Sequence, residues 1–194
     1  MWCATPQQPK TNDPVVPQTN ATACKDAIAT YLQQTKSTTD GQTVEKWATV
    51  TVDYIGRLDD QTVFDTSVES VAKACGRYAT GRDYSQWLSF TVGGGQMIAG
   101  FDKGVEGMKV WETKTVTIPA KDAYGEWDKN KLVTIPKEQI PNADQYQVGM
   151  QVMTSYGQAF KVYQVNDKDI VFDANHELAG KTLIFDITVK SVQK

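Results

Sequence analysis

Apolar residues recur at every second position of KTLIFDITVKSV, residues 181–192. Successive side chains of a β-strand point to opposite faces, so an extended segment would place four of them on one face: Leu183, Phe185, Ile187 and Val189. This period of two predicts a long strand with one buried face. A strand of this kind needs further strands beside it, so we expect a β-sheet at the centre of the fold.

Three other segments carry strand signals. Residues 44–67 alternate and predict a half-buried strand, which Asp59-Asp60 turn into a second extended run ending at Phe64-Asp65. Residues 88–92 (LSFTV) and 112–119 (ETKTVTIP) predict two more strands. Together with residues 181–192, these segments account for five strands.

The glycine-rich stretch VGGGQMIAGFDKG does not fit a nucleotide-binding loop. Gly95 and Gly100 have the spacing of a P-loop, but Phe101 and Asp102 stand where Lys and a hydroxyl residue are needed. The dinucleotide fingerprint lacks its third glycine. The stretch instead predicts a tight turn with positive φ angles. A short buried helix should follow, with one apolar face: Ile98, Phe101, Val105 and Met108.

Composition narrows the class of protein. Of the 194 residues, 22% are charged and 40% hydrophobic, which is ordinary for a globular chain. A net charge of -3 gives no support for nucleic acid or an anionic membrane surface as a partner. No run approaches the roughly 18 apolar residues of a membrane span, so we expect a soluble chain. We also expect a monomer.

The first residues read as a tether. Residues 1–21 contain four prolines among polar residues and predict a flexible segment, and a short helix and linker follow at residues 22–43, with Thr22 as the cap. Cys3 in such a tether is typical of a bacterial lipoprotein, which would make the protein exported and lipid-anchored at the cell envelope. The alternative, an incidental thiol in a cytoplasmic protein, stays open.

Cys24 and Cys75 are the other two cysteines. No C-x-x-C spacing is present, which argues against a metal or dithiol redox site. One disulfide between them, in an exported protein, is one alternative and two free thiols are the other. Sequence spacing leaves both open.

A segment of different character, residues 127–175, separates the last two predicted strands. Its part from 148 to 175 predicts three short strands with a tight turn at Tyr156-Gly157. We expect a small β subdomain inserted into a loop of an antiparallel α+β domain formed by residues 44–126 and 176–194.

Three stretches resemble, in order, the FKBP family of peptidyl-prolyl isomerases: VTVDYIGRLDDQTVFDTS, LSFTVGGGQMIAGFDKGVEGMKVWETKTVTIPAKDAYGE and NHELAGKTLIFDITV. The resemblance runs from about Val44 to Val192. The insertion after DAYG resembles the insert-in-flap chaperone domain of the SlyD-like branch, and the excursion SVESVAKACGRYATGRDYSQW is similar to the bulge of archaeal-type long members. The resemblance implies an antiparallel sheet wrapped on a short helix.

The same resemblance implies a proline-binding pocket and no cofactor or metal. Carried over residue by residue, the catalytic pocket comprises Tyr54, Phe64, Asp65, Met97, Ile98, Phe101, Tyr124 and Phe185, with Leu88 at its edge and His176 and Leu178 at its rim. Phe101 stands where many relatives have tryptophan. Periodicity alone fits a core role for Tyr54 and Phe185 equally well. The single histidine lacks companion ligands, which favours a structural or rim role.

The expected partners are unfolded or proline-containing polypeptides, with macrolides of the rapamycin type as inhibitors. Client binding in the insert would use exposed residues: Met150, Val152, Met153, Tyr156, Phe160 and Tyr163. A core role within the insert is the alternative for these residues. The alternative function is a holdase chaperone or binding module whose prolyl pocket is weakly active or vestigial.

Overall fold

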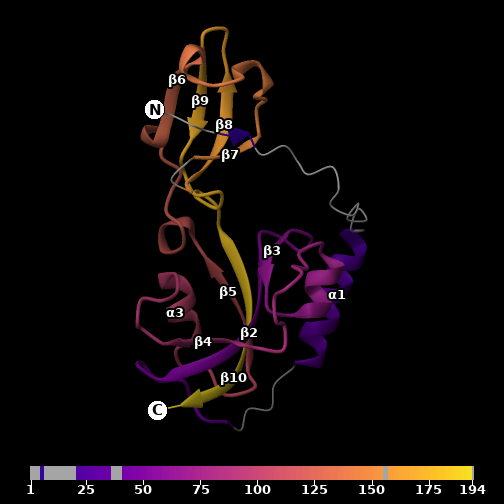
Figure 1. Ribbon diagram of the computed structural model, residues 1–194. Coiled ribbons are helices and arrows are strands. Elements are labelled where there is room, and N and C mark those ends of the chain that lie inside the picture. Colours follow the sequence, from indigo (N-terminus) through magenta and orange to yellow (C-terminus); the bar gives the residue numbers. More distant parts are fainter. Residues whose placement is uncertain (1–4, 7–20, 36–40, 155–156, 194) are drawn as a thin grey trace. The chain divides into compact units, whose positions relative to one another are not determined.

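The computed structural model describes residues 5–6, 21–35, 41–154 and 157–193. It divides into two compact units, whose helices and strands are labelled in Figure 1. The main unit contains residues 21–125 and 180–193, and the inserted unit contains the short strand β1 and Glu126–Ala179. The insert predicted at residues 127–175 lies within the inserted unit.

The main unit is built on an antiparallel sheet in the order β3-β2-β10-β5, with β4 also paired to β2. Its strands are β2 (Thr49–Arg57), β3 (Val63–Thr66), β4 (Leu88–Thr91), β5 (Thr113–Ile118) and β10 (Leu183–Gln193). The alternating segments therefore form the predicted strands. The clearest alternation belongs to β10, which lies between β2 and β5 in the middle of the sheet (Figure 1). This α+β arrangement confirms the predicted fold class.

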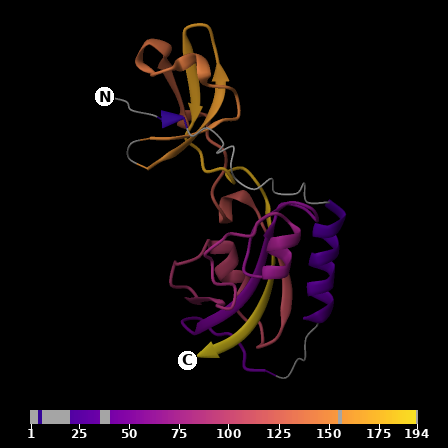
Figure 2. The same cartoon turned by 45° about the vertical axis from the view of Figure 1, so that its right-hand side comes forward.

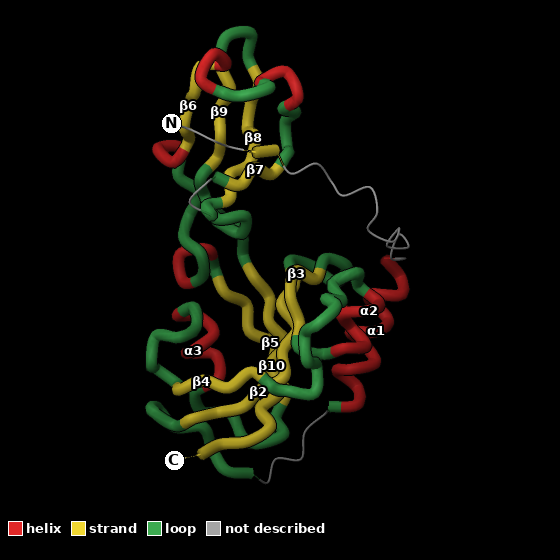
Figure 3. Tube along the Cα trace, viewed as in Figure 1, coloured by secondary structure: helices red, strands yellow, loops and turns green. Residues whose placement is uncertain are grey.

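One face of the sheet is covered by α3 (Ala99–Val105), as Figure 3 shows. Phe101 and Val105 of this helix are buried, as are Ile187 and Val189 of β10. The turn before α3 uses its glycines as predicted, with φ of 79° at Gly93 and 71° at Gly95. Met108, predicted on the helix, is buried but lies beyond the end of α3.

The other face carries α1 (Ala21–Gln34) and α2 (Glu69–Ala74), which Figures 2 and 3 show beside the sheet. A buried cluster joins the two helices to the strands: Cys24, Ile28, Tyr31, Ile55, Val63 and Val71. A disulfide joins Cys24 to Cys75, with an S–S distance of 2.06 Å, which decides between the two alternatives for these thiols. Helix α1 begins at Ala21, so Thr22 lies inside its first turn and not at the predicted cap position.

Buried polar groups lie on the same face as α1. Asp186 of β10 is 0% exposed and accepts hydrogen bonds from Arg57 Nε at 2.8 Å and from Thr115 Oγ1 at 2.6 Å. The Tyr31 hydroxyl of α1 donates to Thr188 Oγ1 at 3.0 Å. These bonds satisfy groups that would otherwise be costly to bury.

The inserted unit has its own sheet, in the order β1-β7-β8-β9-β6. Its strands are β1 (Thr5–Pro6), β6 (Leu132–Pro136), β7 (Gln151–Met153), β8 (Ala159–Val165) and β9 (Asp169–Asp173). Strands β7 to β9 correspond to the three predicted strands, whereas β6 and β1 were not predicted. The remaining elements of the described residues are single 3₁₀ turns: Ala120–Asp122 in the main unit, and Lys129–Lys131, Lys137–Gln139 and Ala143–Gln145 in the inserted unit.

Strand β1 falls within the predicted tether, where Thr5 pairs with Met153 and Pro6 with Val152. The other residues of the tether, Cys3 included, lie outside the described residues. Lipid attachment to Cys3 therefore stays a prediction. Among the described residues, no helix combines the length and apolar character that crossing a bilayer requires.

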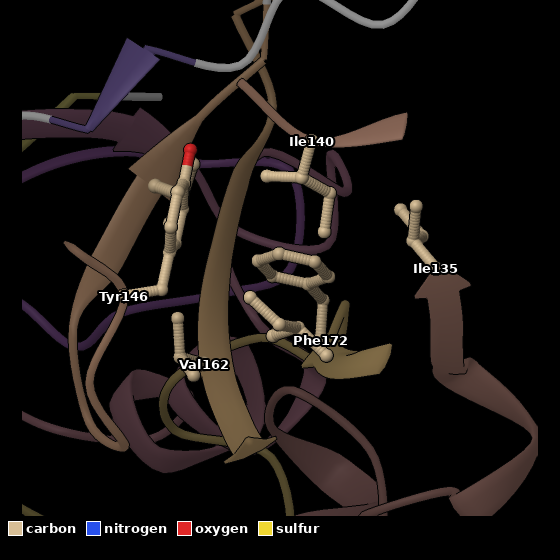
Figure 4. Close-up of a cluster of buried hydrophobic side chains, with 7 residues drawn as sticks. Ile135, Ile140, Tyr146, Val162 and Phe172 are labelled. Carbon is tan, nitrogen blue, oxygen red and sulfur yellow. The ribbon is translucent and has the colours of Figure 1, made fainter. Parts of the chain in front are cut away.

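The inserted unit encloses an apolar core separate from that of the main unit (Figure 4). Its buried members are Ile135, Ile140, Tyr146, Val152, Val162, Ile170 and Phe172. The Tyr146 and Phe172 rings meet edge to face, with centroids 6.0 Å apart. This core comes from segments close in sequence.

Candidate active site

Aromatic rings from five elements meet on the α3 side of the main sheet. Phe185 of β10 is central: its ring centroid lies 5.0 Å from Phe101 of α3, 5.5 Å from Phe64 of β3 and 6.4 Å from Tyr54 of β2. Phe90 of β4 contacts Phe101 at 5.7 Å. We call these five rings the aromatic cluster. Most of its pairs are edge to face, the arrangement favoured by ring quadrupoles.

Gly56 on β2 makes room for two of these rings. A Cβ atom at this position would lie 2.7 Å from carbons of the Phe64 ring and 3.0 Å from the Phe185 ring. Such distances are too short for non-bonded carbon atoms. The sheet can therefore bring the two rings over this strand only because residue 56 has no side chain.

A polar triad borders the aromatic cluster. The Tyr54 hydroxyl donates to Asp65 Oδ2 at 2.5 Å. Arg82 donates from Nη1 to Asp65 Oδ1 at 2.6 Å and from Nη2 to the Tyr54 hydroxyl oxygen at 3.0 Å. Each member of this triad thus contacts the other two. Burial and the hydrogen bond to Asp65 raise the pKa of Tyr54 to about 12, so the hydroxyl stays protonated near neutral pH.

A backbone donor lies at the start of α3. Ile98 precedes the helix, and its carbonyl oxygen accepts from Phe101 N–H at 2.9 Å and Asp102 N–H at 3.1 Å. Its own N–H makes no hydrogen bond with any residue that the structure describes. Both Met97 and Ile98 are half-buried. The turn therefore offers one N–H group to a ligand.

The structure joins five of the predicted pocket residues by direct contacts: Tyr54, Phe64, Asp65, Phe101 and Phe185. Four others belong to the main unit: Met97, Ile98, Leu88 and Tyr124. Of these, Ile98 is bonded to Phe101 through its backbone carbonyl. Leu88 is half-buried on β4 and Tyr124 is exposed after the 3₁₀ turn at Ala120–Asp122.

The two predicted rim residues from the return segment belong to the inserted unit. His176 is exposed, and its Nδ1 accepts a hydrogen bond from Leu178 N–H at 3.1 Å. Leu178 is buried. Within the described residues, no three His, Cys, Asp or Glu side chains gather as a metal site would require.

Sequence reasoning missed three residues around the site. Phe90 was assigned to a strand face but not to the site, although its alternation with Leu88 and Val92 was visible. Gly56 stands inside the strand predicted from alternation, and a glycine in a strand interior is a signal for close approach. Arg82 lies in the long excursion before β4, where no periodic pattern identifies a partner.

The predicted client-binding residues of the inserted unit divide by exposure. Met153 and Tyr163 are exposed, and Met150 and Phe160 are partly buried against the core. The expected exposure of Val152 is wrong: it is 1% exposed, because β7 turns this side chain into the core. Tyr156 lies outside the described residues.

One exposed aromatic pair in the inserted unit was not predicted. Trp127 stacks on Tyr163 with ring centroids 6.0 Å apart and an angle of 29°. Trp127 Nε1 donates to Asp173 Oδ2 at 2.8 Å, which fixes the indole while its ring stays exposed.

Comparisons with known proteins agree with this geometry. Residues 40–190 match the model of the FKBP-type peptidyl-prolyl cis-trans isomerase family. The chain is 44% identical over 151 residues to the short-type peptidyl-prolyl cis-trans isomerase of Methanocaldococcus jannaschii, covering 77% of this chain and 94% of that protein.

Two SlyD proteins are also similar to the chain. It is 33% identical over 110 residues to FKBP-type isomerase SlyD of Escherichia coli K12, covering 55% of this chain and 56% of that protein. SlyD of Treponema pallidum is 34% identical over 110 residues, covering 55% of this chain and 62% of that protein. The matched part thus spans little more than half the length of these SlyD relatives. The family match over residues 40–190 and the 44% identity to the Methanocaldococcus jannaschii protein show that the chain belongs to the FKBP-type peptidyl-prolyl cis-trans isomerases.

Proposed function

We propose that the aromatic cluster is the proline-binding surface of this isomerase. The observation that carries the proposal is the convergence of Tyr54, Phe64, Phe101 and Phe185 beside a hydrogen-bonded polar triad. The substrate's proline ring contacts these rings, and the Ile98 N–H donates to a substrate carbonyl. Tyr124 and Leu88 complete the surface, with Tyr124 hydrogen-bonding the peptide backbone.

Isomerisation of an X–Pro bond requires an apolar environment and no nucleophile. Rotation about an X–Pro bond passes through a twisted amide, over a barrier of about 20 kcal/mol. Twisting breaks the C–N resonance, so the carbonyl loses polarity and the nitrogen gains a lone pair. Apolar rings favour this less polar form relative to water, which solvates the planar amide more strongly. The hydrogen bonds within the polar triad fix the Tyr54 and Asp65 side chains at the edge of the aromatic cluster, where the substrate backbone passes.

A matched pair of phenylalanines tests the location of the site. Phe185→Leu removes the central ring of the aromatic cluster, whereas Phe172→Leu removes a ring from the core of the inserted unit. We expect kcat/KM on a proline tetrapeptide, measured without a coupling protease, to fall at least about tenfold for Phe185→Leu, a loss of about 1.4 kcal/mol. Phe172→Leu should leave it almost unchanged. Equal effects of the two variants would contradict the proposed site.

An NMR titration with a proline-containing peptide gives the direct view. Shifts should centre on Tyr54, Asp65, Ile98, Tyr124 and Phe185. A macrolide of the rapamycin type presents a pipecolyl ring and an adjacent carbonyl, so it should compete for the same signals. Shifts confined to the inserted unit would favour the holdase function with an idle prolyl surface.

We propose further that the inserted unit captures unfolded chains and delivers them to the isomerase surface. Its exposed Trp127–Tyr163 pair, together with exposed Met153, supports this role, because aromatic and thioether groups adapt to many apolar partners. The separate core of the inserted unit supports a division of labour between the two units.

Removal of residues 127–175 with closure of the loop tests that division. Turnover of a tetrapeptide should largely survive, while catalysed refolding of a proline-limited protein should slow sharply. The double variant Trp127→Ser with Tyr163→Ser should slow refolding in the same direction. Trp47→Ser, at an exposed tryptophan of the main unit, is the matched control. Equal loss of both activities on removal would argue against the division of labour.

We propose an exported, oxidising location for the protein, which the Cys24–Cys75 disulfide supports. Thiol labelling of protein freshly drawn from its host should leave both residues unmodified. Mass spectrometry of the membrane fraction should find a diacylglycerol on Cys3 if the protein is also lipid-anchored. Rapid labelling of Cys24 and Cys75 would place the protein in a reducing compartment.

A further inference from the structure

Residues 76–87 form an excursion between α2 and β4. Contacts within the excursion order it, although nearly all of its residues are exposed. The Tyr84 hydroxyl accepts a hydrogen bond from Ala79 N–H at 3.0 Å and donates to the Arg77 carbonyl at 3.3 Å. The rings of Tyr78 and Tyr84 stack, with centroids 5.2 Å apart and an angle of 12°. We call this pair the tyrosine stack.

Arg82 connects the tyrosine stack to the polar triad. Its guanidinium carbon lies 5.3 Å from the centroid of the Tyr84 ring, within the range of a cation–π contact. The same guanidinium donates to Asp65 at 2.6 Å and to the Tyr54 hydroxyl at 3.0 Å. A continuous series of contacts thus runs from the exposed excursion to the edge of the isomerase site.

The ion pair alone is a weak constraint on Arg82. The side chains of Arg82 and Asp65 are 36% and 47% exposed, and exposed pairs of this kind contribute little stability. A long side chain also loses rotamer freedom when it is held in one geometry. The Tyr84 ring supplies the additional contact, and Tyr78 supports Tyr84 from the stack, with Lys73 Nζ 5.1 Å from the Tyr78 ring.

The root of the excursion is tied to the strand that carries Asp65. Arg77 Nε donates to the carbonyl of Val63, the first residue of β3, at 2.7 Å. The excursion is therefore attached to β3 at two points: through Arg77 to Val63 at its start, and through Arg82 to Asp65 near its end. This double attachment fixes where the tyrosine stack meets the site.

We propose that Tyr84, supported by Tyr78, is a positioning residue of the isomerase reaction. Its ring holds the Arg82 guanidinium in the orientation that bonds Asp65 and Tyr54, and so fixes both groups at the edge of the aromatic cluster. Tyr84 acts through Arg82 and does not touch the substrate. This inference rests on the proposed location of the site.

A double-mutant cycle on the full chain tests the inference. Tyr84→Leu and Arg82→Gln should each lower kcat/KM on a proline tetrapeptide by a factor of about two to ten, and the double variant should lose no more than the worse single variant. Tyr84→Phe loses two solvent-exposed hydroxyl bonds but keeps the ring and its cation–π contact, so turnover should stay within about twofold of the parent. Amide NMR spectra should show that β2 and β10 stay folded in every variant.

Three outcomes would overturn the inference. These are multiplicative losses in the double variant, unchanged kcat/KM in Tyr84→Leu, or equal losses in Tyr84→Leu and Tyr84→Phe. Phe185→Leu is measured in parallel to separate this failure from a failure of the proposed site. If Phe185→Leu loses turnover and Tyr84→Leu does not, only the positioning role is wrong. If Phe185→Leu has no effect, the site itself is wrong.

Discussion

The two units each contain an antiparallel sheet, but they differ in the kinds of side chain that they bury. The main unit buries charge: Asp53, Arg57 and Asp186 are all buried within it, and each is paired. The core of the inserted unit is formed by apolar and aromatic side chains. Buried hydrogen-bonded networks specify one geometry, whereas apolar cores tolerate repacking. The difference is in line with the roles proposed above: a precise site in the main unit and the capture of many chains by the inserted unit.

Exposure differs in the same direction. The inserted unit is about half the length of the main unit, yet among the described residues it exposes as many large apolar side chains. Those of the inserted unit are Trp127, Val133, Val148, Met153 and Tyr163. Four predictions test how far the two units differ.

The largest effect should come from the disulfide, which constrains only the main unit. Cys24 and Cys75 are separated by 51 residues, and closing a loop of this length stabilises a fold by about 4 kcal/mol in the chain-entropy model. Reduction should lower hydrogen-exchange protection of amides in β2 and β10 and leave that of β8 and β9 unchanged. Loss of protection in both units would show that their stabilities are coupled.

Next in size is the buried ion pair. Asp186→Asn leaves the Arg57 guanidinium with an exposed partner only and should cost about 3 kcal/mol in the free energy of unfolding, measured with denaturant. Asp60 is the other partner of Arg57, and the Asp60 side chain is 66% exposed. Asp60→Asn should therefore cost less than about 1 kcal/mol in the free energy of unfolding. Similar costs would mean that burial does not decide the strength of these pairs.

A smaller effect should come from the core of the inserted unit. Val152→Ala removes two buried methyl groups and should destabilise that unit by about 1.5–3 kcal/mol, the cavity that is left included. Met153→Ala, on the exposed side of the same strand, should change stability by less than about 0.5 kcal/mol. Met153→Ala should instead weaken binding of an unfolded chain. A binding defect in a stably folded Val152→Ala variant would restore the client-contact role predicted for that residue.

The smallest effect concerns pH. The pKa of Tyr54 is raised from 10.0 to about 12 in the folded protein, so the folded state holds this proton more tightly than the unfolded state. Its contribution to stability is therefore fully present below pH 10.0 and is lost as the pH rises towards about 12. Near neutral pH no change is expected. Tyr54→Phe should lack this alkaline component when denaturant unfolding is compared across the range; identical alkaline profiles would contradict the assignment.

The sequence predicted what depends on local period. Two-residue alternation identified β2 and β10, and the resemblance to a known family located Phe101 and Phe185. Neither signal could assign a role to Arg82, because a cation in an aperiodic loop gains its partner only from tertiary structure. Sequence reasoning misjudged Val152, since a three-residue strand is too short for alternation to reveal its buried face. Strand β6 was not predicted because Ile135 is its one buried residue, which leaves no alternating apolar pattern.

The position of β10 in the chain sets an order of assembly during synthesis. This strand joins β2 to β5, yet it follows the whole inserted unit in sequence. A ribosome therefore completes residues 126–179 before it supplies the strand that closes the main sheet, and domains generally fold as their residues emerge. The inserted unit is ready first. The nascent chain thus holds the complete segment of the inserted unit while its main sheet still lacks β10.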